Sequence, residues 1–255
     1  MDTTSEPLAI VLAAGRGTRM KSDLPKVLVP VLGRPMILWV LDALATAGIN
    51  RAVVVVGYQA PRVQETLASR PGLQFALQEE QLGTGHAVQI CRQHIQQHDG
   101  PVLVVAGDSP LIQADSIREL LDHFRRDGGY ACLLGTLLKD DPTGLGRIVR
   151  DSHGRFARIV EHKDATPEQL SIREVNMSTY LFDSSALLTA LDGLTNNNAQ
   201  REYYLTDCPE ILLRAGHRVD ALPVLRPCEA LSINTVEELQ VVEHKMREMG
   251  YAEHA

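Results

Sequence analysis

Short apolar runs and amphipathic segments alternate through the first half of the chain. Residues 8–12, 52–56 and 101–106 are continuous apolar stretches of strand length. Between them, apolar residues recur at helical spacing, with proline at a segment start and glycine after a segment end, as at Pro35 and Gly48. This alternation predicts an α/β fold with a doubly wound, mixed but mainly parallel sheet, in which ligands bind at the carboxyl ends of the strands.

A glycine-rich basic loop follows the first apolar run. Residues 13–17 read Ala-Ala-Gly-Arg-Gly, and such small residues let backbone amides approach a ligand closely. Four cations follow within a short distance: Arg16, Arg19, Lys21 and Lys26. The loop lacks the third glycine of a dinucleotide fingerprint and the Gly-Lys-Ser/Thr ending of a P-loop. We interpret it as a different kind of phosphate-binding site, although a solvated basic loop would have the same composition.

Composition limits the class of protein. The 255 residues are 44% hydrophobic and 22% charged, which is typical of a soluble globular chain. We expect one domain over residues 1–255, with lobes at 1–110 and 111–255 that share a sheet. The net charge of −7 leaves no broad basic face, which argues against nucleic acid as a partner.

Targeting and cysteine signals favour a cytoplasmic protein. The polar first residues have no signal-peptide core, and no apolar run approaches membrane-spanning length, so we expect no membrane partner. The four cysteines are scattered without paired spacing, which predicts reduced core residues rather than a disulfide frame or zinc site.

The second half predicts a smaller, β-rich lobe. The expected elements are a hairpin at 146–160, a charged loop at 161–169, a strand at 174–182, a helix at 184–191 and a strand at 219–225. A hydroxyl residue followed three positions later by Glu predicts helix starts with capping boxes at Ser116 and at Thr235.

Polar residues after the predicted strands are candidates for a site. Asp108 follows the run at 101–106 and could hold Mg²⁺, or could simply cap the next loop. Asn234 could supply a second oxygen, although as an isolated signal it favours the N-cap of the last helix. Gln78 could read a base edge beside the glycines at 83 and 85. Glu161 and Asn176 could bind sugar groups or be solvated turn residues.

Several longer motifs resemble one enzyme family. Residues 12–20 (LAAGRGTRM) and 24–28 (LPKVL) resemble the signature of nucleotide-diphosphate-sugar pyrophosphorylases. Residues 80–87, 141–148, 159–165 and 194–204 narrow the resemblance to the N-acetylglucosamine-1-phosphate uridyltransferase family. That family is the N-terminal half of a bacterial bifunctional uridyltransferase/acetyltransferase, and the resemblance covers residues 8–240. No hexapeptide repeat follows here, so we expect the acetyltransferase domain and its trimer-forming β-helix to be absent, and the oligomeric state stays open.

The resemblance implies a Rossmann-like fold and a role for each matching residue. It implies that UTP and a sugar 1-phosphate are the substrates, that Mg²⁺ is the cofactor, and that Asp108 and Asn234 hold the metal. It implies catalytic contacts to phosphate from Arg19 and Lys26. The implied substrate-binding residues are Leu12, Ala13, Ala14 and Gly15 for the nucleotide, Gln78, Gly83 and Thr84 for uracil, Ala106 and Gly107 beside them, and Gly146, Glu161, Asn176, Tyr204 and Thr206 for the acetylated amino sugar.

Departures from the family pattern fall mostly on the sugar side. Ala106 stands where many members have Tyr or Ser, Leu145 replaces a usual Tyr, and residues 176–178 read Asn-Met-Ser instead of Asn-Thr-Gly. A related transferase with another sugar or base therefore remains an alternative, as does a non-catalytic nucleotide-sugar-binding domain. The physiological direction of the reaction also stays open.

Overall fold

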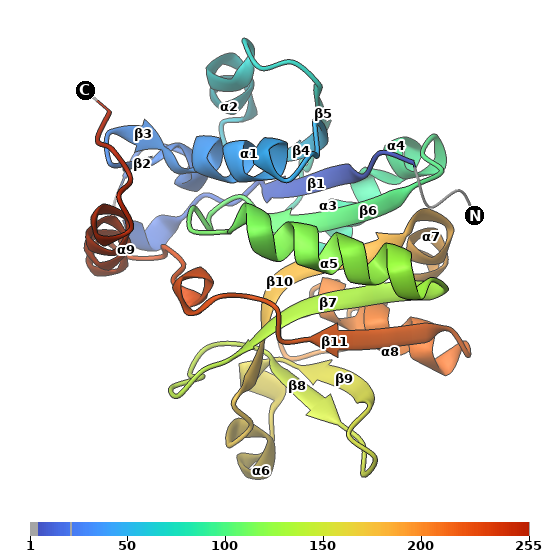
Figure 1. Ribbon diagram of the computed structural model, residues 1–255. Helices are drawn as coiled ribbons and strands as arrows, with labels where there is room; N and C mark the ends of the chain where they lie inside the picture. The colour runs from blue at the N-terminus through green and yellow to red at the C-terminus, as the bar shows by residue number, and fades with distance from the viewer. Residues whose placement is uncertain (1–4, 21, 255) are drawn as a thin grey trace.

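The computed structural model describes residues 5–20 and 22–254, and the basic residue Lys21 lies outside them. Helices pack on both faces of a large twisted sheet (Figure 1). The strands are β1 (Leu8–Ala13), β2 (Pro30–Val31), β3 (Arg34–Pro35), β4 (Arg51–Val56), β5 (Leu73–Leu77), β6 (Pro101–Ala106), β7 (Tyr130–Leu138), β8 (Arg147–Arg150), β9 (Phe156–Val160), β10 (Glu174–Asp183) and β11 (Arg218–Leu222). The α-helices are α1 (Met36–Thr46), α2 (Ala60–Leu67), α3 (Thr84–Ile90), α4 (Arg92–Gln96), α5 (Ala114–Asp127), α6 (Pro167–Leu170), α7 (Ser184–Asp192), α8 (Cys208–Arg214) and α9 (Val236–Glu248).

The main sheet has the strand order β11-β7-β10-β6-β1-β4-β5. The pairs β1–β4, β1–β6, β4–β5 and β7–β11 are parallel, whereas β10 runs antiparallel to both β6 and β7. The β8–β9 hairpin extends from β10 and forms, with α6, the part drawn at the bottom of Figure 1. The predicted fold class, a mixed but mainly parallel doubly wound sheet with a β-rich extension, is confirmed.

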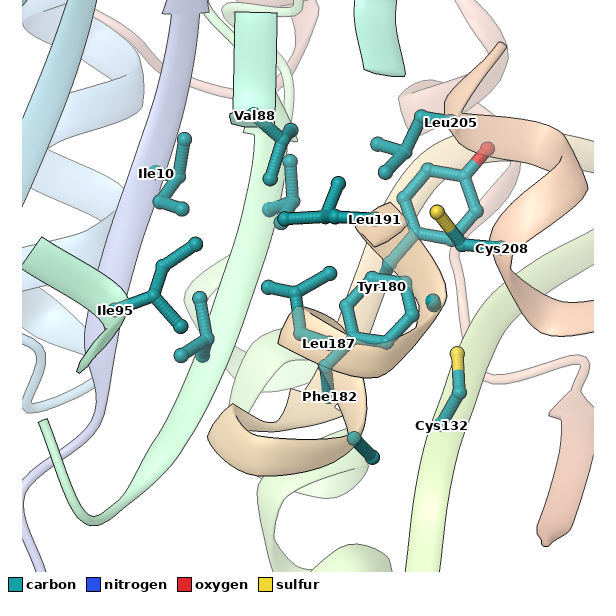
Figure 2. Packing of buried hydrophobic residues seen from close by; sticks show 14 of the residues in the cluster. Ile10, Val88, Ile95, Cys132, Tyr180, Phe182, Leu187, Leu191, Leu205 and Cys208 are labelled. Carbon is teal, nitrogen blue, oxygen red and sulfur yellow. The ribbon is translucent and has the colours of Figure 1, made fainter. Parts of the chain in front are cut away.

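Two hydrophobic cores lie on opposite faces of this sheet. Alternate residues of β1 point to each side: Ile10 belongs to the core under α3, α4, α7 and α8, and Val11 to the core under α1, α2 and α5. Figure 2 shows the first of these cores, where Tyr180 and Phe182 of β10 pack with Leu187 of α7. A strand buried on both faces has to be apolar at every position, which explains the continuous run at residues 8–12.

Three sequence-based expectations were wrong in detail. Helix α5 begins at Ala114 after Gln113, so Ser116 is no N-cap and the predicted capping box there does not form. The Ser116 hydroxyl instead donates to Glu229 at 2.5 Å. The glycines at 83 and 85 also predict one helix around residues 87–95, but the structure has two helices there, which break at Cys91. The strand expected at 219–225 ends at Leu222, and β7 was not anticipated.

The capping box predicted at the last helix is present. The Thr235 hydroxyl accepts from the Glu238 amide at 3.2 Å, and the Glu238 carboxylate accepts from the Thr235 amide at 3.1 Å. All four cysteines are buried and free. Over the described residues, the helices are too short or too polar to cross a lipid bilayer.

Candidate active site

The glycine loop after β1 is held against the segment that carries Lys26. Gly17 has a φ of +69°, and a Cβ placed on it would lie 2.7 Å from the Lys26 Cβ. The conformation and the space therefore both require glycine here. On the neighbouring strand, the Gly107 amide donates to the Leu12 carbonyl at 2.9 Å. This bond fixes the end of β1 beside the turn that carries Asp108.

Three polar side chains converge on the Lys26 ammonium group and its surroundings. Lys26 Nζ donates to Asp108 Oδ2 and, at 2.9 Å, to Asn234 Oδ1, which also accepts from Arg19 Nη2 at 3.2 Å. Asn234, near the C-terminal end of the sequence, thus contacts Arg19 and Lys26, which lie near the N-terminal end. Because Thr235 is the N-cap of α9, the capping role considered for Asn234 is wrong.

Not all of the predicted cations join this group, which we call the Lys26 cluster (Arg19, Lys26, Asp108 and Asn234). The Arg16 guanidinium lies over the Tyr58 ring, 5.1 Å from its centroid. Arg16 therefore extends toward α2 instead of toward Asp108. Of the three predicted cations that the structure describes, Arg19 and Lys26 lie at the centre of the site and Arg16 does not.

The Lys26 cluster has the donor chemistry of a magnesium site. A carboxylate oxygen and an amide oxygen both lie within hydrogen-bond distance of one ammonium, so the two oxygens converge on a single cationic position. Both are hard ligands of the kind that Mg²⁺ prefers, and such sites use one or two protein oxygens plus phosphates and water. The Asp108 side chain is 27% exposed, which leaves room for those other ligands.

The predicted base-binding residues come together at the opposite side of the glycine loop. Gln78 follows β5 and is 4% exposed; its Nε2 donates to the Gly83 carbonyl at 3.2 Å and lies 3.2 Å from His86 Nδ1. Among the described residues, none donates a hydrogen bond to Gln78 Oε1. Thr84 begins α3, and its hydroxyl oxygen accepts from the Leu205 amide at 3.1 Å, which leaves this hydroxyl engaged in the loop.

Gln81 is a site residue that the sequence reasoning did not single out. Its side-chain amide donates to the Ala14 carbonyl at 2.8 Å, and the Tyr58 amide donates to the same oxygen at 3.1 Å. These two bonds fix the peptide that precedes Gly15, so the amides of the turn are held in place before any ligand arrives.

Three of the five predicted sugar-side residues line a pocket of about 360 Å³. Glu161, Tyr204 and Thr206 line it. A Cβ built on Gly146 would lie 3.5 Å from Asn176 Cβ and 3.7 Å from Glu161 Oε2, which places these two side chains together over the glycine. Asn176 is 6% exposed and Thr206 is also 6% exposed, so both present few atoms to solvent.

This pocket is acidic, and burial controls its charge. Desolvation raises the pKa of Glu161, against a hydrogen bond from the Thr206 hydroxyl that lowers it. Burial also raises the pKa of Asp207 to about 6, with further contributions from the charges of Glu210, Glu161 and Asp164. Asp207 was absent from our predictions, because its environment depends on how η4 (Leu205–Asp207) packs on the hairpin.

A second cleft, of about 460 Å³, lies beside the Lys26 cluster. Arg19 and Asn234 line it together with Lys139 and Leu145. Leu145, where the family has Tyr, and Met177 pack against a small apolar cluster around Leu137. These two departures from the family pattern therefore contact the same apolar cluster.

Comparisons with known proteins identify the family of this chain. Residues 8–224 match the family model described as nucleotidyl transferase. A protein from Geobacillus thermodenitrificans called bifunctional protein GlmU is 46% identical over 246 residues, 96% of this chain and 53% of the relative. One of the same name from Pelotomaculum thermopropionicum is 47% identical over 239 residues, 94% and 52% of the two chains. This chain thus spans about half the length of these relatives.

A solved structure gives the same fold. The protein, from Bacillus anthracis, is described as a glucose-1-phosphate thymidylyltransferase in complex with sucrose, and aligns with a TM-score of 0.77 over 96% of this chain and 97% of its own. At 20% identity, this likeness concerns the fold alone. The family match covers most of the chain. In the structure, the loops after β1 and β6 bring a glycine turn, two basic residues and a carboxylate together at one sheet edge. The chain belongs to the nucleotidyl transferase family.

Proposed function

We propose that this chain transfers a uridylyl group from UTP to N-acetylglucosamine 1-phosphate, giving UDP-N-acetylglucosamine and pyrophosphate. The observation that carries the proposal is the Lys26 cluster, in which Arg19 and Lys26, which follow the glycine turn, meet Asp108 and Asn234. Residues 1–110 would bind the nucleotide and residues 111–255 the sugar, with Asn234 of the second lobe reaching back to the first.

The reaction would be a direct in-line displacement. A phosphate oxygen of the sugar 1-phosphate forms a bond to the α-phosphorus of UTP, and the bond between that phosphorus and the bridging oxygen breaks to release pyrophosphate. Such transfers depend on positioning and charge neutralisation rather than on a covalent nucleophile. Bound Mg²⁺, held by Asp108 and Asn234, would supply positive charge and oxygen coordination at the phosphates.

Arg19 and Lys26 would counter the repulsion between the two anionic substrates. Like charges about 4 Å apart repel by roughly 4 kcal/mol at an effective dielectric constant near 20, so the barrier contains several contributions of that size. The amides after Ala14 would add dipoles aimed at the same phosphates, and the bonds from Gln81 and Tyr58 keep them in place.

Base recognition would follow from the orientation of Gln78. Its Nε2 donates one proton to the Gly83 carbonyl and lies 3.2 Å from His86 Nδ1, which can accept the other, so the oxygen is the atom left to meet a ligand. A carbonyl oxygen accepts the N3–H of uracil, whereas the N3 of cytosine carries no proton at neutral pH and would repel it. We therefore expect UTP to be favoured over CTP.

The sugar would lie between Gly146, Glu161, Asn176 and Tyr204. Carboxylate and amide groups can accept and donate to hydroxyl and acetamido groups in one arrangement. The substitutions at Leu145, Met177 and Ser178 fall at or near this side, so the sugar is the substrate that they are most able to change.

A substrate panel tests the proposal. Four nucleoside triphosphates are combined with glucose, glucosamine, galactosamine and N-acetylglucosamine 1-phosphates, and Mg²⁺-dependent pyrophosphate release is measured. The expected result is turnover highest with UTP and N-acetylglucosamine 1-phosphate. A different best pair would indicate a related transferase, and UDP-sugar binding without turnover would indicate a binding domain. Size-exclusion chromatography with light scattering would give the oligomeric state.

A further inference from the structure

Strand β10 carries an irregularity that begins at Asn176, which lies with Glu161 of the sugar-side pocket over Gly146. Its pairing with β7 advances three residues from Asn176 to Thr179 while β7 advances one, from Thr136 to Gly135. Ser178, inside this bulge, has a φ of +54°, a conformation that non-glycine residues rarely adopt. Strain of this kind persists only when surrounding contacts enforce it, and it concentrates at functional sites.

The bulge fixes the orientation of the Asn176 amide. The Ser178 backbone N–H donates to Asn176 Oδ1 at 3.2 Å. A backbone N–H can only donate, so the acceptor end of the Asn176 amide has to face it. The donor end then faces Tyr180, and Nδ2 donates to the phenol oxygen at 2.6 Å.

The Tyr180 side chain is buried in the hydrophobic core. It is 1% exposed, and its ring stacks on Phe182 with 6.0 Å between centroids. Figure 2 shows its ring in the core between α7 and the Cys208 side chain. Burial, followed by the charge of Glu161, raises the pKa of Tyr180 well above its ordinary value, so the phenol stays neutral.

These contacts set what Asn176 can offer to a ligand. One of its two Nδ2 protons is taken by Tyr180, and one direction at Oδ1 is taken by Ser178. One N–H and one oxygen lone pair therefore remain for a ligand, and the bond to Tyr180 fixes their directions. Without the phenol oxygen, a nearly buried N–H would lose its acceptor and the amide could rotate.

We propose that Tyr180 is a positioning residue for the sugar subsite: its buried hydroxyl orients the Asn176 amide that would bind the sugar 1-phosphate. The proposal rests on the proposed function, since it assigns that function's sugar subsite. It predicts that a change on the core side of β10 alters the affinity for one substrate and leaves the affinity for the other unchanged.

The test is Tyr180→Phe, with Phe182→Leu as the matched control. Both variants change a buried aromatic residue of the same strand, but only the first removes the acceptor of Asn176 Nδ2. We expect Tyr180→Phe to raise the KM for N-acetylglucosamine 1-phosphate about tenfold while the KM for UTP stays within twofold. Phe182→Leu should lower the melting temperature without separating the two KM values.

Other outcomes would overturn the inference. Equal changes in both KM values, or an unchanged KM for the sugar phosphate, would show that Tyr180 only packs in the core. If the unmodified protein released no pyrophosphate with any substrate pair, the proposed function would fail. The inference would then depend on calorimetric titration with UDP-N-acetylglucosamine, where tenfold weaker binding by Tyr180→Phe supports it and unchanged binding refutes it.

Discussion

The substitution Asp108→Asn tests the centre of the site with little change of shape. The carboxylate follows β6, accepts a hydrogen bond from Lys26, and is one of two oxygens that face that ammonium. Asparagine keeps the size and one oxygen but removes the charge. The variant therefore separates the electrostatic role of Asp108 from its place in the packing.

The structure indicates a small effect on folding and a large one on turnover. The Lys26 and Asp108 side chains are 13% and 27% exposed. Their attraction of roughly 4 kcal/mol at a dielectric constant near 20 is largely offset by desolvation, so we expect a loss of about 1 kcal/mol in stability. A lost contact to the charge of the transition state costs about 3–4 kcal/mol, which is on the order of 10²- to 10³-fold in kcat/KM.

The assay is pyrophosphate release over a series of Mg²⁺ concentrations, with thermal melting of each variant. Asp192→Asn is the control, because Asp192 also pairs with one basic residue, Arg92, at 2.7 and 3.1 Å, but on α7 at a surface remote from the site. A kcat/KM within threefold of the unmodified protein for Asp108→Asn, at every Mg²⁺ concentration, would refute the assigned role.

Three further predictions use other parts of the site. Gly17→Ala should lower kcat/KM at least tenfold because its Cβ meets Lys26, whereas Gly154→Ala, with φ +77° and open space, should cost about 1 kcal/mol of stability and leave turnover unchanged. Asp207→Asn should raise the free energy of unfolding in urea by up to about 3 kcal/mol at pH 7.5 and not at pH 4. The folded pKa of about 6 exceeds the ordinary 3.8, so ionisation of Asp207 destabilises the native state as pH rises between these values. Arg19→Ala should lose about 10²- to 10³-fold in pyrophosphate release with an unchanged melting temperature; near-normal turnover would exclude Arg19 from the reaction.

The central strands could be predicted because they are buried on both faces. In β1, β4 and β6, nearly every position faces one core or the other, which leaves a continuous apolar signal in the sequence. Strand β7 is equally buried but reads YACLLGTLL, with four leucines and an internal glycine. Such a run fits a helix as well as a strand, and its extended form comes from pairing with β10 and β11.

Helix starts show the limit of local signals. The pattern at Thr235 and Glu238 forms its capping box, whereas the same pattern at Ser116 does not. At the start of α5, which contains Ser116, Glu229 accepts from the Gln113 amide at 3.0 Å and from the Ser116 hydroxyl at 2.5 Å. A carboxylate from a distant loop therefore serves the helix start, and nothing in the neighbouring sequence indicates it.

The site divides in the same way. The meeting of Lys26 and Asp108 could be anticipated, because strand ends and the loops after them share one sheet edge. The place of Asn234 beside them was implied only by the family resemblance, since no strand ends directly before it. Tyr180 could not be anticipated, since its position in the sequence is that of an ordinary core aromatic. Its polar contact exists only because two residues of β10 are left out of the pairing with β7.

The Lys26 cluster joins residues that lie far apart in the chain. In this structure Lys26 already engages the oxygens of both Asp108 and Asn234, so the cluster is internally compensated before substrates bind. A metal at those oxygens would compete with the ammonium, and the displaced ammonium would need a new anionic partner. The phosphates of a nucleotide at the glycine turn supply such a partner. Binding of the metal and binding of the nucleotide should therefore each favour the other. Asn234 directly precedes Thr235, the N-cap of α9, and would connect both binding events to the second half of the chain.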